Sequence, residues 1–370
     1  MQLLLLIAAT ALVAFANGAN DNFKAVATAY GSGTLGYRPA LRLATVAQLA
    51  GSVASVALAW SLVRTFGGKD LLPDEVVAAP VFLASVAAGA GGTVLFATRL
   101  GVPVSTTHAL VGGLVGAGLG LAPASLRWES LGGTFVLPLL TSPIAALSIA
   151  AVGYRGASAA RRRLGVTATT CVCVGAEVRR VEIGADGSMA FAETGLTLSA
   201  DEREGCERRY GGEVLGFSAQ AVVDRLHLAS AFGLGFARGL NDTPKVLALL
   251  VAARWSGLDP RWSLAGIAAA MALGGWVGSR RIARTLGHEI TRMNRGQGLV
   301  ANLTASALVI GASLAGMPVS TTHVSTGAII GIGVAEAGTR WRLVSGIALA
   351  WVATLPVAGL LAYIASWLAR

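Results

Sequence analysis

Charged side chains are scarce in this chain of 370 residues, where lysine, arginine, aspartate and glutamate together make up 13%. An average soluble domain has roughly 25%. Hydrophobic residues make up 54%, and the mean hydropathy is +0.66. Apolar runs of about 20 residues, enough for a helix to cross a bilayer, recur along the whole chain. Because these runs are continuously apolar and do not alternate, they favour helices over membrane strands and predict an all-α integral membrane protein.

Cysteine is also rare, with only Cys171, Cys173 and Cys206, all outside the apolar runs. An odd number without a secretory framework argues against a disulfide scaffold, and three thiols without a nearby histidine fall short of a zinc site. We therefore predict reduced, structural cysteines. The formal net charge is +10, but the basic residues lie between apolar runs without interleaved aromatic residues. They indicate membrane topology, and we expect no nucleic-acid partner.

Two polar segments interrupt the apolar runs, and each resembles the other. They are Asn17–Lys24 (NGANDNFK) and Arg238–Lys245 (RGLNDTPK), and each is followed by a second matched pair, Val102–His108 (VPVSTTH) and Met317–His323 (MPVSTTH). We call the first pair the knots and the second pair the hydroxyl segments. Repetition of both pairs in the same order indicates that the chain is a duplicated unit.

The apolar runs predict five spans in each unit. Their approximate limits are 2–30, 40–66, 76–100, 103–121, 131–154, 226–254, 262–285, 297–316, 318–337 and 341–368. An odd number of spans per unit makes the second unit enter the membrane upside down, as in the inverted repeats of many secondary transporters. The hydroxyl segments can instead form short re-entrant hairpins, which would change the number of spans.

The segment between the repeats differs in composition, with charges of both signs, turn residues and alternating runs. We expect a first membrane repeat over 1–160, a small soluble insert with a hairpin or two over 161–216, and a second membrane repeat over 217–370. Arginines in the connecting loops place both termini outside and the insert in the cytoplasm. The arginines on the expected cytoplasmic side are Arg38, Arg42, Arg99, Arg155, Arg161, Arg162, Arg163, Arg280, Arg281, Arg284, Arg292, Arg295, Arg340 and Arg342. The basic residues on the expected external side are Arg64, Lys69, Arg127, Arg254, Arg261 and Arg370.

The first apolar run also resembles a signal peptide, because 3–16 is apolar and ends in Ala14-Phe15-Ala16. It has no basic residues before the apolar core, and cleavage would remove half of the span that carries the first knot. We therefore interpret it as a membrane span.

The knots combine helix-breaking residues with ionisable ones. Asn-Gly in the first knot and Gly-Leu-Asn in the second predict a break in each helix, which exposes free amides and free carbonyls as sites for an anion and a cation. Asp21 and Lys24 are three residues apart and share one helical face, as do Asp242 and Lys245. Ionisable groups in spans cost about 2.5 to 3.5 kcal/mol each, so their duplication favours a functional role over simple mutual neutralisation.

Each hydroxyl segment has a proline followed by three consecutive hydroxyl residues at the start of an expected helix. Hydroxyls among the free amides of a first turn form a cradle for an oxyanion. Capping of the helix by Ser105 or Ser320 alone would need one hydroxyl and not three. His108 and His323 can carry protons or bond a neighbouring helix, and we favour the structural role.

The knots and the hydroxyl segments resemble motifs of the inorganic phosphate transporter family of secondary transporters. Its signature, Gly-Ala-Asn-Asp-Val-Ala-Asn-Ala, occurs once in each inverted half, and 18–21 and 239–242 are similar to its first half. The hydroxyl segments also look like the family's, so the resemblance covers both membrane halves and skips the insert. It implies a phosphate site between the halves. The residues implied near the substrate or the coupling ion are Asn20, Asp21, Asn241, Asp242, Ser105, Thr106, Thr107, Ser320, Thr321 and Thr322, with Asp21 and Asp242 as candidate sodium ligands and Arg238, His108 and His323 as further candidates.

The chain departs from that signature at four positions. Lys24 and Lys245 stand where the family has its second asparagine, and Asn22 and Thr243 stand where it has valine. An ammonium beside a cation site can replace the cation, so the coupling ion is left open between proton and sodium. The lysines can equally strengthen anion binding, so we include Lys24 and Lys245 among the predicted substrate-binding residues. Some relatives are thought to carry sulfate.

We therefore expect a phosphate transporter of the plasma membrane without a cofactor, with a sulfate carrier or a passive anion channel as alternatives. A membrane hydrolase built from Asp21, Ser105 and His108 is a more distant alternative. Duplication argues against it, because a hydrolase needs one such set and the chain repeats every member. The sequence leaves open whether two copies form a homodimer.

Overall fold

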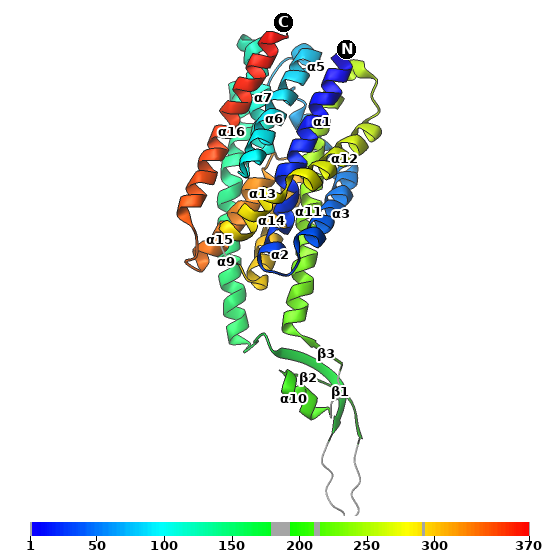
Figure 1. Cartoon of the computed structure of the whole chain (residues 1–370), viewed down its shortest axis with the longest axis vertical. Helices are drawn as coiled ribbons and strands as arrows, with labels where there is room; N and C mark the ends of the chain where they lie inside the picture. The colour runs from blue at the N-terminus through cyan, green and yellow to red at the C-terminus, as the bar shows by residue number, and fades with distance from the viewer. Residues whose placement is uncertain (1, 179–192, 211–214, 291–292, 370) are drawn as a thin grey trace, which may run out of the picture. The chain divides into compact units, whose positions relative to one another are not determined.

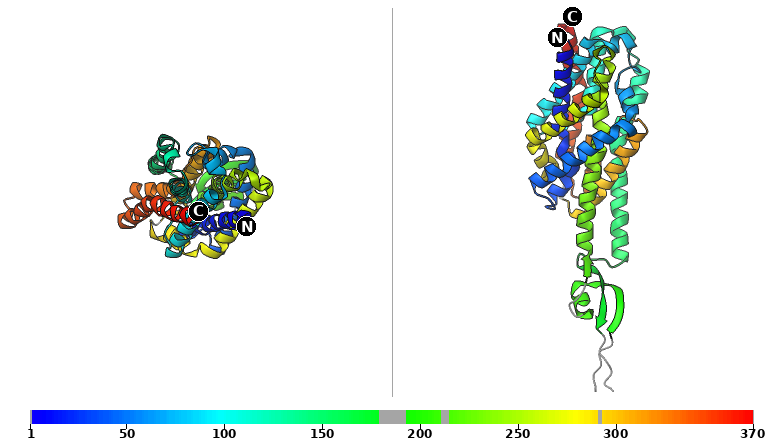
Figure 2. Two further views of the ribbon diagram at one scale, coloured as in Figure 1. Left: turned by 90° about the horizontal axis from the view of Figure 1, so that it is seen from above. Right: turned by 90° about the vertical axis from the view of Figure 1, so that its right-hand side faces the viewer.

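The computed structural model describes residues 2–178, 193–210, 215–290 and 293–369 (Figure 1). The chain divides into two compact units, one made of Met1–Tyr154 with Leu228–Arg370 and the other of Arg155–His227. The first unit is a bundle of helices lying side by side (Figure 2).

The helices of the first unit are long where the sequence is continuously apolar and short where polar residues or glycine interrupt it. In the first half they are α1 (Gln2–Asp21), the 3-10 helix η1 (Asn22–Val26), α2 (Ala27–Gly31), α3 (Tyr37–Leu58), α4 (Trp60–Phe66), α5 (Asp74–Ala78), α6 (Pro80–Leu100), α7 (Thr106–Leu121), η2 (Pro123–Ser125), α8 (Trp128–Ser130), the π-helix η3 (Leu131–Val136) and α9 (Leu137–Arg163). In the second half they are α11 (Ala219–Ala252), η4 (Arg254–Ser256), α12 (Pro260–Gly278), α13 (Arg280–Arg284), the π-helix η5 (Thr285–Glu289), α14 (Arg295–Leu314), α15 (Thr321–Ala335) and α16 (Trp341–Leu368). Helices α9 and α11 continue into the second unit.

The helices confirm an all-α membrane protein but give fewer full spans than the ten predicted. In the described part of the chain, six helical segments are long and apolar enough to cross a membrane, and a seventh is counted if α12 and the residues to Gly287, bent by 67°, form one span. The other three predicted spans correspond to α7, α15 and α11. Helices α7 and α15 have 16 and 15 residues, too few to cross about 30 Å of hydrocarbon at about 1.5 Å per residue. Helix α11 carries ionisable residues along its length.

The two knots differ in backbone structure. In the first, the α-helix ends at Asp21 and the chain continues as the 3-10 helix η1, so an interruption is present as predicted. In the second, α11 runs through the knot without a break, and the predicted break is wrong. The glycine serves close packing instead: a Cβ at Gly239 would lie 2.1 Å from the Gln48 carbonyl of α3, and one at Gly18 would lie 1.8 Å from the Met271 carbonyl of α12.

The two helices that follow the hydroxyl segments, α7 and α15, each pack against a helix of the other half of the chain. Helix α7 packs on α16 of the other half, where a Cβ at Gly116 would lie 1.9 Å from the Gly359 carbonyl. Helix α15 in turn meets α9, where a Cβ at Gly331 would lie 2.3 Å from the Leu147 carbonyl. Glycine at the contact lets two backbones approach closely, which is how membrane helices associate without a hydrophobic driving force. Each short hydroxyl helix therefore packs against the half to which it does not belong as well as against its own.

The second unit contains a three-stranded antiparallel sheet in the order β2-β1-β3 and the short helix α10 (Arg203–Arg209). Its strands are β1 (Thr170–Val178), β2 (Glu193–Glu202) and β3 (Leu215–Ser218). Cys173 of β1 and Cys206 of α10 form a disulfide with a Cα–Cα distance of 6.1 Å, and Cys171 is free and buried. The prediction of three reduced cysteines is therefore wrong for two of them, because α10 packs on β1 and brings together thiols that are 33 residues apart.

Candidate functional site

The knots and the hydroxyl segments meet in the interior of the first unit. Every predicted substrate residue is at most 4% exposed. These residues are Asn20, Asp21, Lys24, Ser105, Thr106, Thr107, Asn241, Asp242, Lys245, Ser320, Thr321 and Thr322. Buried polar groups need partners, and the partners found here come from both halves of the chain.

Lys24 lies in a cage of oxygen atoms. Its ammonium donates hydrogen bonds to Asn20 Oδ1 at 3.0 Å and to the Val104 carbonyl at 2.9 Å. It also donates to the Asp21 carboxylate, with which it forms an ion pair, and to the Thr322 hydroxyl. Four oxygens therefore surround one ammonium, and one of the four belongs to the opposite half of the chain.

Lys245 has the equivalent surroundings in the second half. Its ammonium donates to the Val319 carbonyl at 2.6 Å and to Thr107 Oγ1 at 2.8 Å, and the nearest Asp242 oxygen lies 3.6 Å away. Asn241 Nδ2 donates to the same Val319 carbonyl at 3.3 Å. Each lysine thus contacts the carbonyl that precedes the serine of its own hydroxyl segment and a threonine of the other one.

The two aspartates are joined by shared donors. Thr106 Oγ1 donates to Asp21 at 3.2 Å, and Thr321 Oγ1 donates to Asp242 at the same distance. Asn17 Nδ2 lies 3.1 Å from an Asp21 oxygen and 3.3 Å from an Asp242 oxygen. Asn17 therefore bridges the carboxylates of the two halves.

Arg238 breaks the correspondence between the knots, because it stands where the first knot has Asn17. The Arg238 guanidinium is 2% exposed. It donates to Asn17 Oδ1 at 2.6 Å and to Asn22 Oδ1 at 3.0 Å, and its Nε lies 3.7 Å from an Asp242 oxygen. One arginine of the second half thus fastens the first knot to the second.

The site carries an excess of positive charge. Three basic side chains and two acidic ones, each at most 3% exposed, are gathered there, namely Lys24, Lys245, Arg238, Asp21 and Asp242. Taking an ion out of water costs several kcal/mol, which pairing and hydrogen bonds offset only when their geometry is good. With one net positive charge and four threonine hydroxyls nearby, the arrangement can hold an oxyanion if an ammonium turns from its carboxylate toward the anion.

The serines and the threonines of the hydroxyl segments have different contacts. Ser105 Oγ accepts from the backbone N–H of His108 at 3.1 Å and caps α7, and Ser320 Oγ accepts from that of His323 at 3.2 Å and caps α15. The threonine hydroxyls instead reach the knots and the facing carbonyls. The capping interpretation thus describes both serines, while the anion cradle stays a prediction.

The two histidines lie against each other, with ring centroids 4.5 Å apart. The His323 ring also stacks on Trp351 of α16 at 4.0 Å, and its Nδ1 lies 3.4 Å from the Leu139 carbonyl of α9. These contacts are with helices of both halves, and the expectation of a structural role for His108 and His323 stays a prediction.

Several residues of the site escaped the sequence analysis. Thr98 Oγ1 accepts from Asn20 Nδ2 at 2.9 Å, and Ser313 Oγ donates to Asn241 Oδ1 at 3.1 Å. Both stand seven positions before the serine of their hydroxyl segment, which is a signal that a closer alignment of the halves would have found. The contacts of Asn17 had no such signal, because its counterpart is an arginine.

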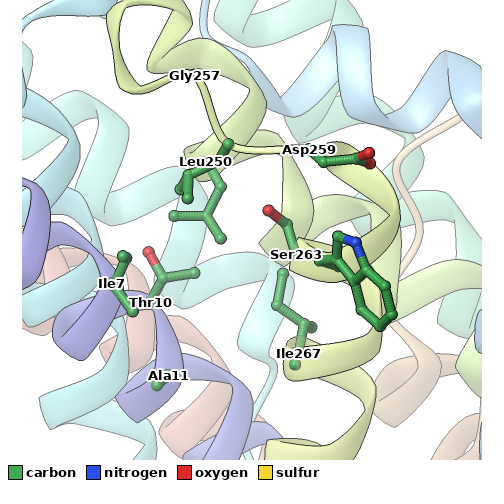
Figure 3. Close-up of a pocket in the computed structure, with 11 residues that line it drawn as sticks. Ile7, Thr10, Ala11, Leu250, Gly257, Asp259, Ser263 and Ile267 are labelled. Carbon is green, nitrogen blue, oxygen red and sulfur yellow. The ribbon is translucent and has the colours of Figure 1, made fainter.

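A cavity elsewhere in the unit lacks the predicted residues. It measures about 410 Å³, lies between α1 and α12, and is lined mainly by apolar side chains such as Ile7, Leu250 and Ile267 (Figure 3). Among the described residues, no group of three or more histidine, cysteine, aspartate or glutamate side chains could hold a metal ion. The chemistry of the unit is therefore concentrated where the knots meet the hydroxyl segments.

Comparison with known proteins identifies the family. Residues 17–362, which contain both knots and both hydroxyl segments, match the model of the phosphate transporter family. The chain belongs to this family. A protein of Mycobacterium tuberculosis named "Probable low-affinity inorganic phosphate transporter" is 31% identical over 374 residues, which cover 97% of this chain and 75% of the relative. A protein of the same name from Mycobacterium leprae is 27% identical over 380 residues, covering 99% and 78%.

A solved structure entitled "The sodium-dependent phosphate transporter" has the same fold as this member of the phosphate transporter family. It superposes with a TM-score of 0.77 at 20% identity and covers 100% of this chain and 98% of its own. Because the family consists of transporters, the chain is a multi-pass protein of the plasma membrane and not an enzyme. The hydrolase alternative is thereby set aside.

Proposed function

We propose that this chain is a secondary active transporter that moves inorganic phosphate by alternating access and is coupled to protons, with Lys24 and Lys245 replacing bound sodium in part. The observation that carries the proposal is the pair of buried ammonium groups, each held by a carboxylate or a carbonyl of its own half and by a threonine of the other. Family membership supports phosphate as the substrate. Sulfate is the alternative oxyanion, and the assay below includes it.

The oxygen cage around Lys24 supports the choice of coupling ion. A carboxylate, a side-chain amide oxygen, a backbone carbonyl and a hydroxyl are the kinds of ligand that a hard cation such as sodium takes. In this chain an ammonium occupies that position. A cation fixed to the protein cannot be carried across the membrane, so a mobile ion must supply the coupling, and the two aspartates are the proton acceptors of the site.

The proposed cycle links one proton to one substrate movement. While Asp21 is ionised it holds Lys24, because an opposite charge nearby favours both ionised forms. When Asp21 takes up a proton, the ion pair is lost and the ammonium turns toward the entering anion. Release of the proton on the other side restores the pair and expels the anion. Asp242 and Lys245 repeat this arrangement in the second half.

Matched contacts support the proposal of two inverted repeats over 1–160 and 217–370. Thr322 donates to the Val104 carbonyl at 2.8 Å, and Thr107 donates to the Val319 carbonyl at 3.2 Å. The exchange of the glycine-bearing helices α7 and α15 follows the same rule. In transporters of this kind, rocking of one repeat against the other opens the site first to one side and then to the other.

We also propose that both termini are external and that the insert, 161–216, is cytoplasmic. The arginines of both halves favour this orientation. The disulfide between Cys173 and Cys206 argues the other way, because disulfides persist mainly in oxidising compartments. We keep the orientation that the arginines indicate, because the arginines in the loops of both repeats agree on it. The disulfide is a single bond within the insert.

The test is uptake of radiolabelled phosphate by proteoliposomes, with pH and sodium gradients imposed separately. We expect uptake against a phosphate gradient when a pH gradient is present and little response to sodium. Uptake that only follows the phosphate gradient would indicate a passive channel, and stronger competition by sulfate than by phosphate would indicate a sulfate carrier.

A further inference from the structure

A second hollow, of about 920 Å³, opens beside the C-terminal end of α6 and is strongly basic. Four arginines line it, and no acidic residue does. They are Arg99 of α6 and Arg280, Arg281 and Arg284 of α13. We call this hollow the arginine vestibule. None of the four forms an ion pair with a described acidic residue.

The vestibule reaches the buried site. Thr98 and Ala19 are among its lining residues, and Thr98 Oγ1 accepts a hydrogen bond from Asn20 Nδ2 at 2.9 Å. Asn20 in turn accepts from the Lys24 ammonium at 3.0 Å. The vestibule therefore touches the first knot at Ala19, and a single side chain, Asn20, joins its wall at Thr98 to the Lys24 ammonium. An anion leaving or entering the site on this side would pass the arginines.

Its walls are held together by contacts between α6 and the bend after α12. The Arg281 guanidinium donates to the Arg99 carbonyl, and Thr285 Oγ1 donates to the Gly101 carbonyl at 3.1 Å. These contacts use backbone carbonyls at the end of α6 and just after it, and no hydrogen bond or ion pair within the described part of the chain engages the Arg99 guanidinium. All four arginines are exposed, so they can meet a ligand from solution.

The corresponding place in the other half lacks most of this charge. The segment 279–287 (SRRIARTLG) aligns with 59–67 (AWSLVRTFG), so that Arg284 corresponds to Arg64 whereas Arg280 and Arg281 correspond to Trp60 and Ser61. In the same way 98–101 (TRLG) aligns with 313–316 (SLAG), which replaces Arg99 by leucine. Three of the four arginines are therefore additions to one of two otherwise matching places.

We propose that the arginine vestibule is a second binding site for a phosphate group, on the side that the loop arginines place in the cytoplasm. Guanidinium groups match the geometry of phosphate oxygens and bind them in pairs. The phosphate group belongs either to free inorganic phosphate in transit, in which case the inference rests on the proposed function, or to the headgroup of an acidic lipid.

The positive-inside rule alone accounts for arginines on this side but not for their arrangement. Topology is satisfied by basic residues anywhere in the short loops. Here three extra arginines come from two separate segments and line one hollow that ends next to the buried site. A basic cleft of this kind raises the local concentration of an anion and its rate of entry by roughly tenfold or more.

The first test compares phosphate transport from the two sides in right-side-out and inside-out membrane vesicles. The variants are Arg280→Gln with Arg284→Gln, whose side chains form no hydrogen bond or ion pair with α6 in the described part of the chain, and Arg99→Leu with Arg281→Ser, which installs the residues of the other half. Arg64→Gln is the matched control. We expect the vestibule variants to raise the KM for phosphate presented at the cytoplasmic side about tenfold, with the external KM unchanged.

The second test identifies a lipid source. Purified protein is reconstituted in phosphatidylcholine with and without phosphatidylglycerol. If a lipid headgroup is the ligand, phosphatidylglycerol increases phosphate uptake by the wild type and not by the vestibule variants. The KM for phosphate at the cytoplasmic side is then the same in the wild type and the variants. The inference is overturned if the wild type transports phosphate and the variants match it in both tests. A wild type that transports no phosphate refutes the proposed function. Thermal unfolding of the purified proteins with and without phosphatidylglycerol then decides the vestibule, and the inference is overturned if the lipid raises the unfolding temperature of the wild type and the vestibule variants equally.

Discussion

Replacement of both lysines by the asparagine of the family signature is the sharpest test of the proposed coupling. Lys24→Asn with Lys245→Asn removes two ammonium groups from oxygen cages and leaves the Asp21 and Asp242 carboxylates without them. Breaking a buried ion pair by removing one partner costs about 3 to 5 kcal/mol. Without added cations, we expect each single variant to be less stable than the wild type by about that amount, with Lys24→Asn the more severe because its ammonium has four oxygen partners.

Sodium should restore part of this loss in the variants and not in the wild type. A cation bound only to the folded state at about 100 times its dissociation constant adds roughly 2.7 kcal/mol, which for a chain of 370 residues corresponds to a rise in Tm of about 3 to 4 °C. The measurement is thermal unfolding of the purified variants in sodium chloride and in choline chloride. Lys69→Asn is the matched control, since Lys69 is paired with Asp74 but is 42% exposed.

Transport should change in parallel. We expect wild-type uptake to follow an imposed pH gradient and the double variant to acquire dependence on sodium. A wild type whose uptake requires sodium and ignores the pH gradient would refute the reasoning. A folded double variant that neither binds nor uses sodium would also refute it, because the cage would then not be a cation site.

Three further predictions concern the hydroxyl segments, the orientation and the packing. Ser105→Ala and Ser320→Ala should each lower stability by about 1 kcal/mol, as expected for a lost cap, and should raise the KM for phosphate, so unchanged uptake kinetics would remove the serines from the anion cradle. A cysteine introduced at Leu196, which is 81% exposed, should resist an impermeant external reagent in intact cells, and labelling there would place the insert outside. Gly239→Ala should prevent correct packing of α11, because its Cβ would lie 2.1 Å from a carbonyl of α3. The control Gly266→Ala, whose Cβ would have no atom within 4 Å, should raise the stability of helix α12 by about 0.5 to 1 kcal/mol. Equal expression and equal unfolding temperature of the two variants would contradict the close contact at Gly239.

The fold class and most residues of the candidate site could be predicted from local features of the sequence. The apolar runs gave the membrane helices, and the positions of Asp21 and Lys24 three residues apart gave their ion pair. Span number was harder, because α7 and α15 are apolar after their first turn or two but have only 16 and 15 residues. The helix break in the second knot was wrong because the same glycine that weakens an isolated helix permits close packing against another.

The sequence by itself determined which residues of the two halves correspond to each other, because the repeated motifs pair the aspartates, the lysines and the hydroxyl residues of one half with those of the other. Only the tertiary structure decided which of them touch. Lys24 contacts a threonine 298 positions away, and Arg238 binds Asn17 across 221 positions. No spacing along the chain encodes such pairs. They exist because exchanged helices bring the two halves face to face, and because buried charges without bulk water must be satisfied by whichever groups the packing places beside them.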